Sequence, residues 1–77
     1  MPEAIVLLII DPRIESALIE EVKNYPGVVD AHYLYGPYDM YIKITADSDE
    51  GIHNLVLDKI RRLYGVKSTT TMLIANK

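Results

Sequence analysis

The sequence predicts an α+β protein of the ferredoxin-like class, with the element order βαββαβ, a four-stranded antiparallel sheet and two helices on one face of that sheet. Three observations support this prediction. Residues 4–10 are all apolar, residues 40–45 alternate between aliphatic and more polar side chains, and the two halves of the 77-residue chain repeat the same residue types 38 positions apart. The chain has the length of one small domain, which we expect to span residues 1–77.

The first predicted strand covers residues 4–10, because a continuous apolar run rich in β-branched residues is typical of a strand buried on both faces. Asp11 and Pro12 then predict the start of a helix, with Asp11 as its N-cap and Pro12 as its first residue. The helix ends at Pro26 and Gly27. Its apolar stripe has helical spacing and consists of Ile14, Ala17, Leu18, Val22 and Tyr25.

The next two strands are predicted to form a hairpin, with Gly36 and Pro37 in its turn. The first of them covers residues 28–35 and the second covers residues 40–45. Side chains alternate across a strand, so one face of the first carries Val29, Ala31, Tyr33 and Tyr35, and the other carries Val28, Asp30, His32 and Leu34. In the second strand, one face carries Met40, Ile42 and Ile44.

A second helix and a last strand complete the predicted order. Asp47 and Glu50 have the spacing of a capping box at the start of the helix. Gly65 is placed to end it as a C′ glycine, and residues 66–75 form the last strand. The apolar stripe of this helix consists of Ile52, Leu55, Val56, Ile60 and Leu63.

The internal repeat supports the two-fold βαβ arrangement. Matching positions are Asp11 and Asp49, Ile14 and Ile52, Leu18 and Val56, Val22 and Ile60, Tyr25 and Leu63, and Gly27–Val28 and Gly65–Val66. Because crossover connections are right-handed, both helices are expected on the same face. The other face then remains uncovered, although residues 4–10 supply apolar side chains to it. An uncovered apolar face predicts a homodimer, with sheet packed on sheet.

Composition limits the classes of function. The chain has no cysteine and two histidines, which excludes disulfides and thiolate metal sites and gives no reason to expect a structural metal or a cofactor. A net charge of −3 does not fit a free-standing nucleic-acid-binding domain. The apolar residues 4–10 are too few to span a membrane, and no positive charge precedes them as in a signal peptide. We therefore expect a cytoplasmic protein.

The turn at residues 35–39 is the candidate binding site. It combines glycine, proline, two tyrosines and a carboxylate between two strands. Asp39 can meet the ammonium group of an amino acid, and backbone amides around Gly36 can meet its carboxylate, because glycine permits close approach to the main chain. The hydroxyl groups of residues 69–71 add donors and acceptors. Each feature also has an ordinary structural explanation: a tight turn, a turn-capping aspartate and strand threonines.

Catalysis finds less support in the sequence. There is no cysteine nucleophile, and His53 lies at the margin of the second helix. His32 and Asp30 share a strand face and could form a proton-transfer pair, although a pair of same-face neighbours is the simpler interpretation. No calcium-loop or phosphate-loop pattern is present. We therefore predict no catalytic and no metal-binding residues.

The turn at residues 36–39 and the strand that follows it resemble the G-x-Y/F-D segment of the Lrp/AsnC family. The Gly65–Val66 pair and the threonines of residues 69–71 resemble the glycine-valine and T-x-T features of the same family. The resemblance extends over essentially the whole chain, and is to the family's domain for regulation of amino-acid metabolism. Regulators of this family usually carry an additional helix-turn-helix domain, for which these 77 residues have no room. The sequence therefore resembles stand-alone forms of the domain.

This resemblance implies a function in effector sensing. It implies homodimers formed through the sheets, dimers assembled into an octamer- or decamer-like ring, and an amino acid bound between dimers. The ligand-binding residues that it implies are Tyr35, Gly36, Tyr38 and Asp39 of the turn and Thr69, Thr71 and Met72 of the last strand. It also implies possible co-assembly with full-length relatives, and no direct contact with nucleic acid.

The alternative is a small dimeric ferredoxin-like enzyme, a cofactor-free monooxygenase or isomerase that uses His32 and a tyrosine in a cavity facing the sheet. An apolar cavity between sheet and helices would favour this enzyme. A polar pocket at residues 36–39, between dimers, would favour the sensor.

Overall fold

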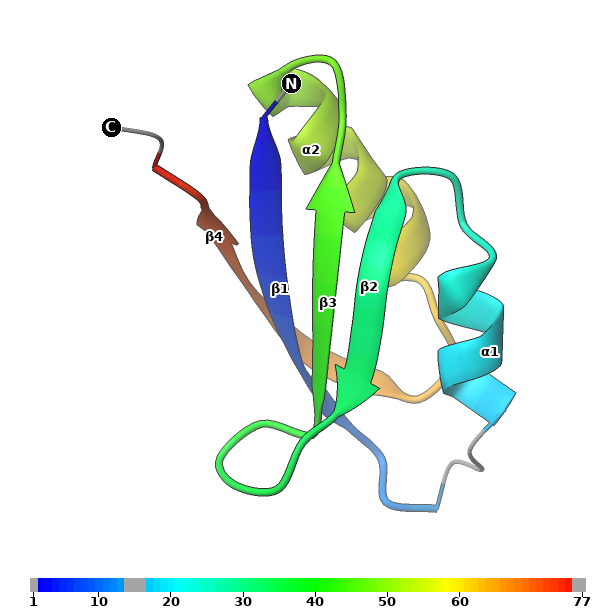
Figure 1. The fold of residues 1–77 in the computed structure, drawn as a ribbon. Coiled ribbons are helices and arrows are strands. Elements are labelled where there is room, and N and C mark those ends of the chain that lie inside the picture. Colours follow the sequence, from blue (N-terminus) through cyan, green and yellow to red (C-terminus); the bar gives the residue numbers. More distant parts are fainter. Residues whose placement is uncertain (1, 14–16, 76–77) are drawn as a thin grey trace.

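The computed structural model describes residues 2–13 and 17–75, and its strands form one sheet with the order β2-β3-β1-β4 (Figure 1). All neighbouring strands are antiparallel, so β1 and β3 are central and β2 and β4 are edges. In Figure 1, α2 lies behind the sheet and α1 lies to the side of β2, and side chains of both helices join those of the sheet in one buried cluster, as the ferredoxin-like prediction requires. The elements are β1 (Glu3–Ile10), α1 (Ala17–Lys23), β2 (Val28–Tyr33), β3 (Met40–Thr45), α2 (Asp49–Leu55), the π-helix η1 (Val56–Ile60) and β4 (Val66–Leu73).

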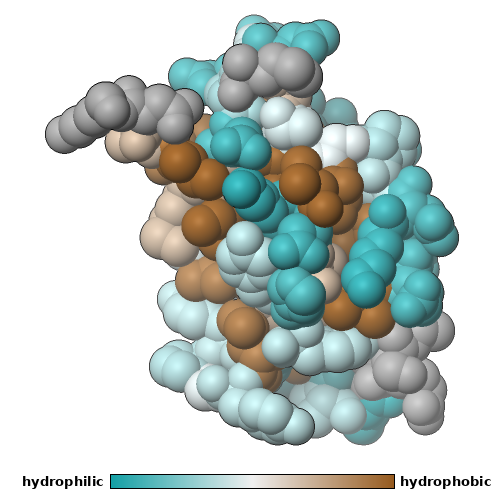
Figure 2. Space-filling view, in the orientation of Figure 1, coloured by the Kyte–Doolittle hydropathy of each residue, from teal (hydrophilic) through white to brown (hydrophobic). Residues whose placement is uncertain are grey.

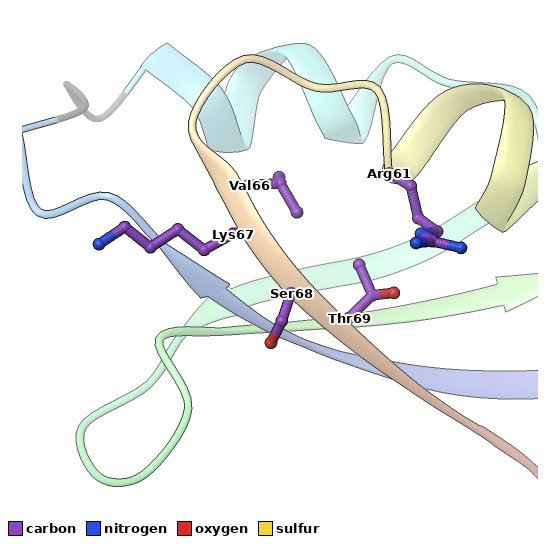
Figure 3. Close-up of a pocket in the computed structure, with 5 residues that line it drawn as sticks. All are labelled: Arg61, Val66, Lys67, Ser68 and Thr69. Carbon is purple, nitrogen blue, oxygen red and sulfur yellow. The ribbon is translucent and has the colours of Figure 1, made fainter.

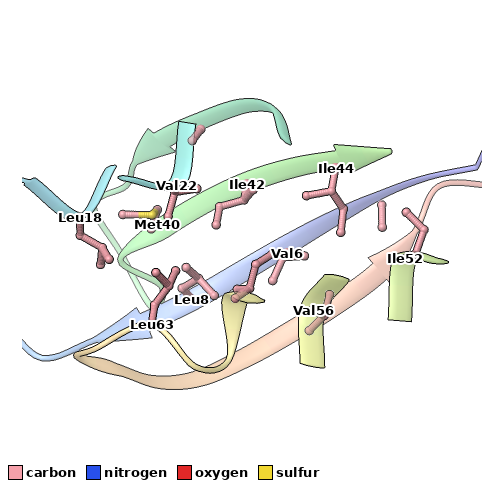
Figure 4. Packing of buried hydrophobic residues seen from close by; sticks show 13 residues of the cluster. Val6, Leu8, Leu18, Val22, Met40, Ile42, Ile44, Ile52, Val56 and Leu63 are labelled. Atoms are coloured by element: carbon pink, nitrogen blue, oxygen red, sulfur yellow. The ribbon is translucent and has the colours of Figure 1, made fainter. Parts of the chain in front are cut away.

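The face of the sheet that the helices cover holds the core (Figure 4). The alternation predicted for β3 is confirmed, since Met40, Ile42 and Ile44 are completely buried. Burying one such side chain contributes about 1.5–3 kcal/mol. The rest of the core comes from β1, β2 and the helices: Ala4, Val6, Leu8, Leu18, Val22, Ala31, Ile52, Val56, Ile60 and Leu63.

The opposite, open face of the sheet is apolar along β1. Ile5 and Leu7 are half-buried and Ile9 is exposed, although all three point away from the core. Figure 2 shows this face, with a column of hydrophobic residues over β1 beside hydrophilic residues over β3. Met72 of β4 lies opposite Ile5 in the strand register and extends the apolar surface. The prediction that β1 is apolar on both faces is therefore confirmed.

The start of α1 differs from the prediction. Pro12 and Arg13 form a turn, and the helix begins at Ala17 in the part of the chain that the structure describes. The Asp11 carboxylate nevertheless accepts a hydrogen bond from the Arg13 backbone N–H at 2.9 Å, as expected of a side chain in a capping position. The predicted contribution of Ile14 to the apolar stripe lies outside the described residues.

The two halves end their helices with the same backbone geometry. Gly27 has φ of 93° and Gly65 has φ of 92°, a conformation that glycine adopts without strain. The hydrogen bonds before each glycine also match, since Tyr25 N–H donates to Val22 O at 3.1 Å and Leu63 N–H donates to Ile60 O at 3.2 Å. The repeat in the sequence is therefore a repeat in the structure.

Both edge strands have a bulge at matching positions of the repeat. Val28 pairs with Ile44 and Asp30 pairs with Lys43, which leaves Val29 without a partner on β3. Val66 pairs with Ile10 and Ser68 pairs with Ile9, which leaves Lys67 without a partner on β1. A bulge of this kind places one extra residue in a strand and redirects its side chain.

The bulge in β2 makes part of the predicted alternation wrong. Val29 was expected to share a face with Ala31, but Val28 packs against the core and Val29 is 56% exposed. The extra residue changes the parity of the strand, which a pattern of period two does not reveal. The strand also ends at Tyr33 rather than at residue 35.

The second helix begins and continues differently from the prediction. Its N-cap is Ser48, whose hydroxyl accepts from Gly51 N–H at 3.0 Å, so the capping box predicted from Asp47 and Glu50 is wrong. Its second part is the π-helix η1, where Arg61 N–H donates to Val56 O at 2.8 Å. The apolar stripe predicted for this helix is confirmed, since Ile52, Val56, Ile60 and Leu63 are buried and Leu55 is partly buried. Strand β4 ends at Leu73 instead of residue 75.

Among the described residues, no helix has the length and apolar character required to cross a membrane.

Candidate functional site

The hairpin turn between β2 and β3 is open to solvent and held at its base. Tyr35 is fully exposed, and Gly36 has φ of 138° with no described atom within 4 Å of the position that a Cβ would take. Tyr38 is half-buried. At the base, Leu34 N–H donates to Asp39 O at 2.9 Å, and Asp39 N–H donates to Leu8 O at 2.8 Å. The turn is therefore fixed to the end of β1.

The Asp39 side chain strengthens this attachment. Its Oδ2 accepts a hydrogen bond from the Ile10 backbone N–H at 2.9 Å, across 29 residues of sequence. Asp39 therefore stabilises the turn through Oδ2, as its ordinary structural interpretation predicts. No described residue donates a hydrogen bond to the other oxygen, Oδ1. The carboxylate is held by one oxygen, and its second oxygen remains available to a ligand.

A cleft of about 490 Å³ lies beside Asp39. It is formed where the turn, the end of β1 and the start of β4 meet. The residues that line it are Ile9, Ile10, Asp11, Pro12, Tyr33, Leu34, Asp39 and Lys67. Of these, the sequence singled out only Asp39 as a ligand-binding residue. The others come together through strand pairing over long distances in the chain, for which no local pattern gives a signal.

The charged side chain at the β1 end of this cleft is that of Asp11. Asp11 accepts from the Arg13 guanidinium through both carboxylate oxygens, at 3.0 Å and 2.7 Å. These hydrogen bonds lower the pKa of Asp11 to about 2, with a further contribution from the positive charge of Lys67. Asp11 is therefore ionised at neutral pH and already paired with a cation, and Lys67 lies near enough to affect it.

The predicted ligand-binding residues of β4 do not all lie at the turn. The strand register places Thr69 opposite Leu8 and Thr71 opposite Val6, on the helix side of the sheet, and Met72 opposite Ile5 on the open face. Thr71 lines a different cleft, of about 250 Å³, with Asp49, Ile52, His53 and Leu73. Thr69 lies closest to the turn, two residues after Lys67. Within one chain the structure thus separates Thr71 and Met72 from Asp39.

A polar pocket of about 350 Å³ lies between the end of the second helix and β4 (Figure 3). Its lining residues are Arg61, Val66, Lys67, Ser68 and Thr69. Figure 3 shows the Arg61 side chain near Thr69, whereas Lys67 extends in the other direction, toward the end of β1. The two cations therefore do not converge on one point in this pocket.

The His32 and Asp30 side chains lie within hydrogen-bond distance of each other on the open face. His32 Nε2 lies 3.0 Å and 3.1 Å from the two carboxylate oxygens of Asp30. The imidazole stacks on Tyr41, with ring centroids 6.1 Å apart. Both members of the pair are exposed, and no group of three potential metal ligands occurs among the described residues. The geometry is that of same-face neighbours.

Comparison with known proteins identifies similar chains. A family model described as the Lrp/AsnC ligand binding domain matches residues 3–77. An uncharacterized HTH-type transcriptional regulator of Pyrococcus horikoshii is 33% identical over 73 residues, which are 91% of this chain and 49% of that protein. The chain thus spans about half the length of this regulator and of two other curated Pyrococcus regulators that it matches.

Two further similarities extend the comparison. A homocitrate synthase of Sulfurisphaera tokodaii is 32% identical over 62 residues, which are 80% of this chain and only 13% of the enzyme. A crystal structure of a protein from Thermus thermophilus is 28% identical and superimposes with a TM-score of 0.91, covering 100% of this chain and 96% of that one. The same fold therefore occurs as a chain of nearly this length.

Proposed function

The chain belongs to the Lrp/AsnC ligand-binding domain family, and from this premise we propose that it is an amino-acid-sensing regulatory module. It binds a small amino-acid effector and acts in the cytoplasm on transcription or on amino-acid metabolism. The observation that carries the proposal is the cleft beside the turn, where Asp39 is held by Ile10 N–H through one oxygen and presents the other. A carboxylate fixed in this way is a suitable partner for an ammonium group.

The proposed site is shared between chains. Tyr35, Gly36, Tyr38 and Asp39 contribute from the turn of one chain. Thr69, Thr71 and Met72 contribute from β4 of a neighbouring chain. The positions of Thr71 and Met72 support sharing, because the strand register places both toward the opposite end of the sheet from the turn. The exposure of Tyr35 and the open space around Gly36 also suit a contact with another subunit.

Oligomerisation is part of the proposal. The apolar column of Ile5, Leu7 and Ile9 on the open face is the surface through which two chains form a homodimer. Dimers assemble further into an octamer- or decamer-like ring, which brings turns and β4 strands of different dimers together. Small domains often obtain stability through partner subunits, because one short chain buries little surface.

The module acts through partners and does not read DNA itself. Residues 3–77 match a ligand-binding domain, and a net charge of −3 suits an effector-binding role better than contact with phosphates. Co-assembly with full-length Lrp/AsnC regulators would connect it to transcription. The similarity to part of a homocitrate synthase supports metabolic enzymes as a second kind of partner.

No observation favours the alternative of a cofactor-free monooxygenase or isomerase. That enzyme would need an apolar cavity between sheet and helices, and completely buried side chains such as Leu8, Ile42 and Ile60 pack in that layer. His32, the proposed catalytic residue, lies on the opposite face of the sheet.

A thermal-shift screen against the twenty amino acids tests the proposal. A true effector at a hundredfold excess over its dissociation constant should stabilise the protein by about 2.7 kcal/mol, which raises the melting temperature measurably. Asp39→Asn should reduce the shift, because it removes the charge but keeps an oxygen for Ile10 N–H. Asp58→Asn, an exposed residue on η1, is the matched control. If no amino acid raises the melting temperature, the sensing function is wrong.

Analytical ultracentrifugation at micromolar concentration tests the assembly. The expected species is a dimer or a multiple of dimers. A monomer under these conditions would contradict the proposed sheet-to-sheet contact.

A further inference from the structure

The charges of the chain are unevenly distributed along the sequence. All eleven acidic residues lie in residues 1–58, whereas five of the eight basic residues lie in residues 59–77. Four of these five lie between η1 and the start of β4: Lys59, Arg61, Arg62 and Lys67. A chain that is acidic as a whole therefore carries a local excess of positive charge where its second helix leads into its last strand.

The polar pocket between the second helix and β4 lies within this basic segment. All five residues that line it belong to the segment, and none of them is acidic. Two are cations, Arg61 and Lys67, and two carry hydroxyl groups, Ser68 and Thr69. Val66 alone supplies an aliphatic side chain. The lining thus offers positive charge and hydrogen-bond donors, without a carboxylate that would repel an anion.

Arg61 is the cation best placed to bind a ligand in this pocket. Its backbone is fixed at the end of η1, where its N–H donates to Val56 O at 2.8 Å. Its side chain lies near Thr69, which the strand register places on the helix side of the sheet (Figure 3). Among the described residues, the guanidinium has no ion-pair or hydrogen-bond partner. Its planar fork of donors is therefore available to the oxygens of a ligand.

The neighbouring Arg62 distinguishes this pocket from an ordinary basic helix end. Cations in the last turn of a helix interact favourably with the helix dipole, which explains both arginines equally well. Both are exposed, but of the two it is Arg61 that lines the pocket. A comparison of the two arginines can therefore separate a specific site from diffuse positive charge.

The size and charge of the pocket indicate its ligand. Its volume of about 350 Å³ is near the lower limit for ligand pockets, which span roughly 300–1,000 Å³. One valine offers too little apolar surface for a nucleobase or a long aliphatic chain. Two cations without an acid favour a dianion over a monoanion, because Coulomb attraction increases with the charge of the ligand. A phosphate monoester fits, since it carries a charge of about −1.5 to −2 at pH 7 and three acceptor oxygens.

We propose that this pocket binds a phosphoryl group, either as inorganic phosphate or as the monoester of a small metabolite, with Arg61 as bidentate donor and the Thr69 hydroxyl as a further donor. Lys67 extends away from Arg61 and contributes positive potential at the rim (Figure 3). The pocket shares Lys67 alone with the cleft beside the turn, where Asp39 lies. The proposal concerns a second ligand and does not rest on amino-acid sensing.

Titrations followed by two-dimensional amide NMR locate and measure this binding. The probes are inorganic phosphate and glycerol 3-phosphate, with acetate and dimethyl phosphate as monoanions, all at one ionic strength because salt screens exposed charges. Both dianions should bind, and each monoanion should bind about tenfold or more weakly, as expected for the loss of one charge-assisted interaction. The amide signals of Ser68 and Thr69 should shift with phosphate, whereas that of Asp39 should not.

Three variants assign the donors. Arg61→Gln removes the charge and keeps a long polar side chain, so it should weaken phosphate about tenfold or more. Thr69→Val keeps the shape of the side chain and should weaken phosphate about fivefold, the loss of one neutral hydrogen bond. Arg62→Gln is the matched control, since it removes the same charge one residue away and should change the affinity by less than about twofold in screening salt.

Each outcome decides for or against the site. If both dianions bind and Arg61→Gln weakens them selectively, the site is correct and accepts phosphorylated metabolites. If inorganic phosphate alone binds in this way, the site is correct and accepts the free ion. If Arg62→Gln weakens phosphate as much as Arg61→Gln, if a monoanion binds as tightly, or if neither dianion binds, the proposal is wrong. None of these results bears on amino-acid sensing, which the thermal-shift screen tests separately.

Discussion

The two βαβ halves of the molecule have matching backbones and differ in chemistry at the position of the bulge. Gly27 and Gly65 have φ values of 93° and 92°, and each precedes an edge strand whose second residue is bulged. In the first half the bulged residue is Val29, which is 56% exposed, and in the second half it is Lys67, which lines the cleft beside the turn. The backbone at the bulge sets the direction of the side chain. The residue type at that position decides whether the side chain brings a charge to a binding site.

A second difference concerns the carboxylate. The turn that leads into β3 supplies Asp39, whose Oδ2 accepts from the end of β1. The matching position of the first half is Met1, so the sequence supplies no acid there. Only one end of the pseudo-symmetric sheet therefore combines a lysine bulge with a carboxylate. The two halves share a backbone arrangement, and the second half supplies both the lysine of the bulge and the carboxylate of Asp39.

The largest expected difference between the halves lies in the core. Val22 and Ile60 occupy matching positions and are both completely buried. Ile60→Ala should lower the free energy of unfolding by about 2–5 kcal/mol, because it leaves a cavity under the sheet. Val22→Ala removes one carbon fewer and should cost less. Urea denaturation at one protein concentration measures both, and a larger loss for Val22→Ala would show that the halves are not packed equivalently.

Backbone strain should give the next largest effect. Gly27→Ala forces a left-handed conformation on alanine and places a Cβ 2.9 Å from Thr45 O and 3.1 Å from Leu55 Cδ2. Strain of this kind costs on the order of 1–3 kcal/mol, before the contact with Thr45 is added. Gly36→Ala has strain but open space, so it should be less destabilising. Equal losses in thermal denaturation would mean that the contact with Thr45 relaxes without cost.

Exchange of the bulged residues should affect stability less than the core and glycine substitutions do. Lys67→Val and Val29→Lys are surface changes, and each should alter the free energy of unfolding by no more than about 0.5 kcal/mol. Only Lys67→Val should weaken amino-acid binding in calorimetry. If Val29→Lys weakens binding equally, the lysine of β4 has no special part in the site.

The smallest effect concerns the ion pair at the end of β1. Hydrogen bonds from Arg13 lower the pKa of Asp11 to about 2, below its ordinary value of 3.8. A lowered pKa in the folded state adds stability above pH 3.8, and this stability is lost as the pH falls toward 2. The melting temperature of the wild type should therefore exceed that of Asp11→Asn at pH 6, and the gap should close near pH 2. A gap that does not change with pH would mean that the charge contributes nothing.

Local patterns predicted the elements of the fold because the physical causes are local. The alternation of Met40, Ile42 and Ile44 and the glycines at the helix ends correspond to burial and to positive φ. The bulge at Val29 was missed, because one extra residue changes the face of a side chain without changing its hydrophobicity. Ser48 was missed as the N-cap, because Asp47 is an equally good capping residue in isolation.

The candidate site was less predictable. Asp39 could be singled out because its turn has a distinctive sequence, and the structure places it at a cleft. Lys67 could not, since its position depends on the register between β1 and β4, more than fifty residues apart in the chain. The shared site with Thr69, Thr71 and Met72 stays a prediction, because it depends on contacts between chains.

The hydrogen bond from Ile10 to Asp39 also makes one backbone amide a reporter of the turn. Amides of β1 inside the ladder exchange their hydrogen with solvent when strands separate, whereas the Ile10 N–H is protected by a side chain from a loop 29 residues away. Its exchange rate should therefore follow the motion of the hairpin turn and not the opening of the sheet. A ligand that binds Asp39 and steadies the turn would slow exchange at Ile10 more than at Leu8, so a single resonance can be used to follow occupancy of the cleft.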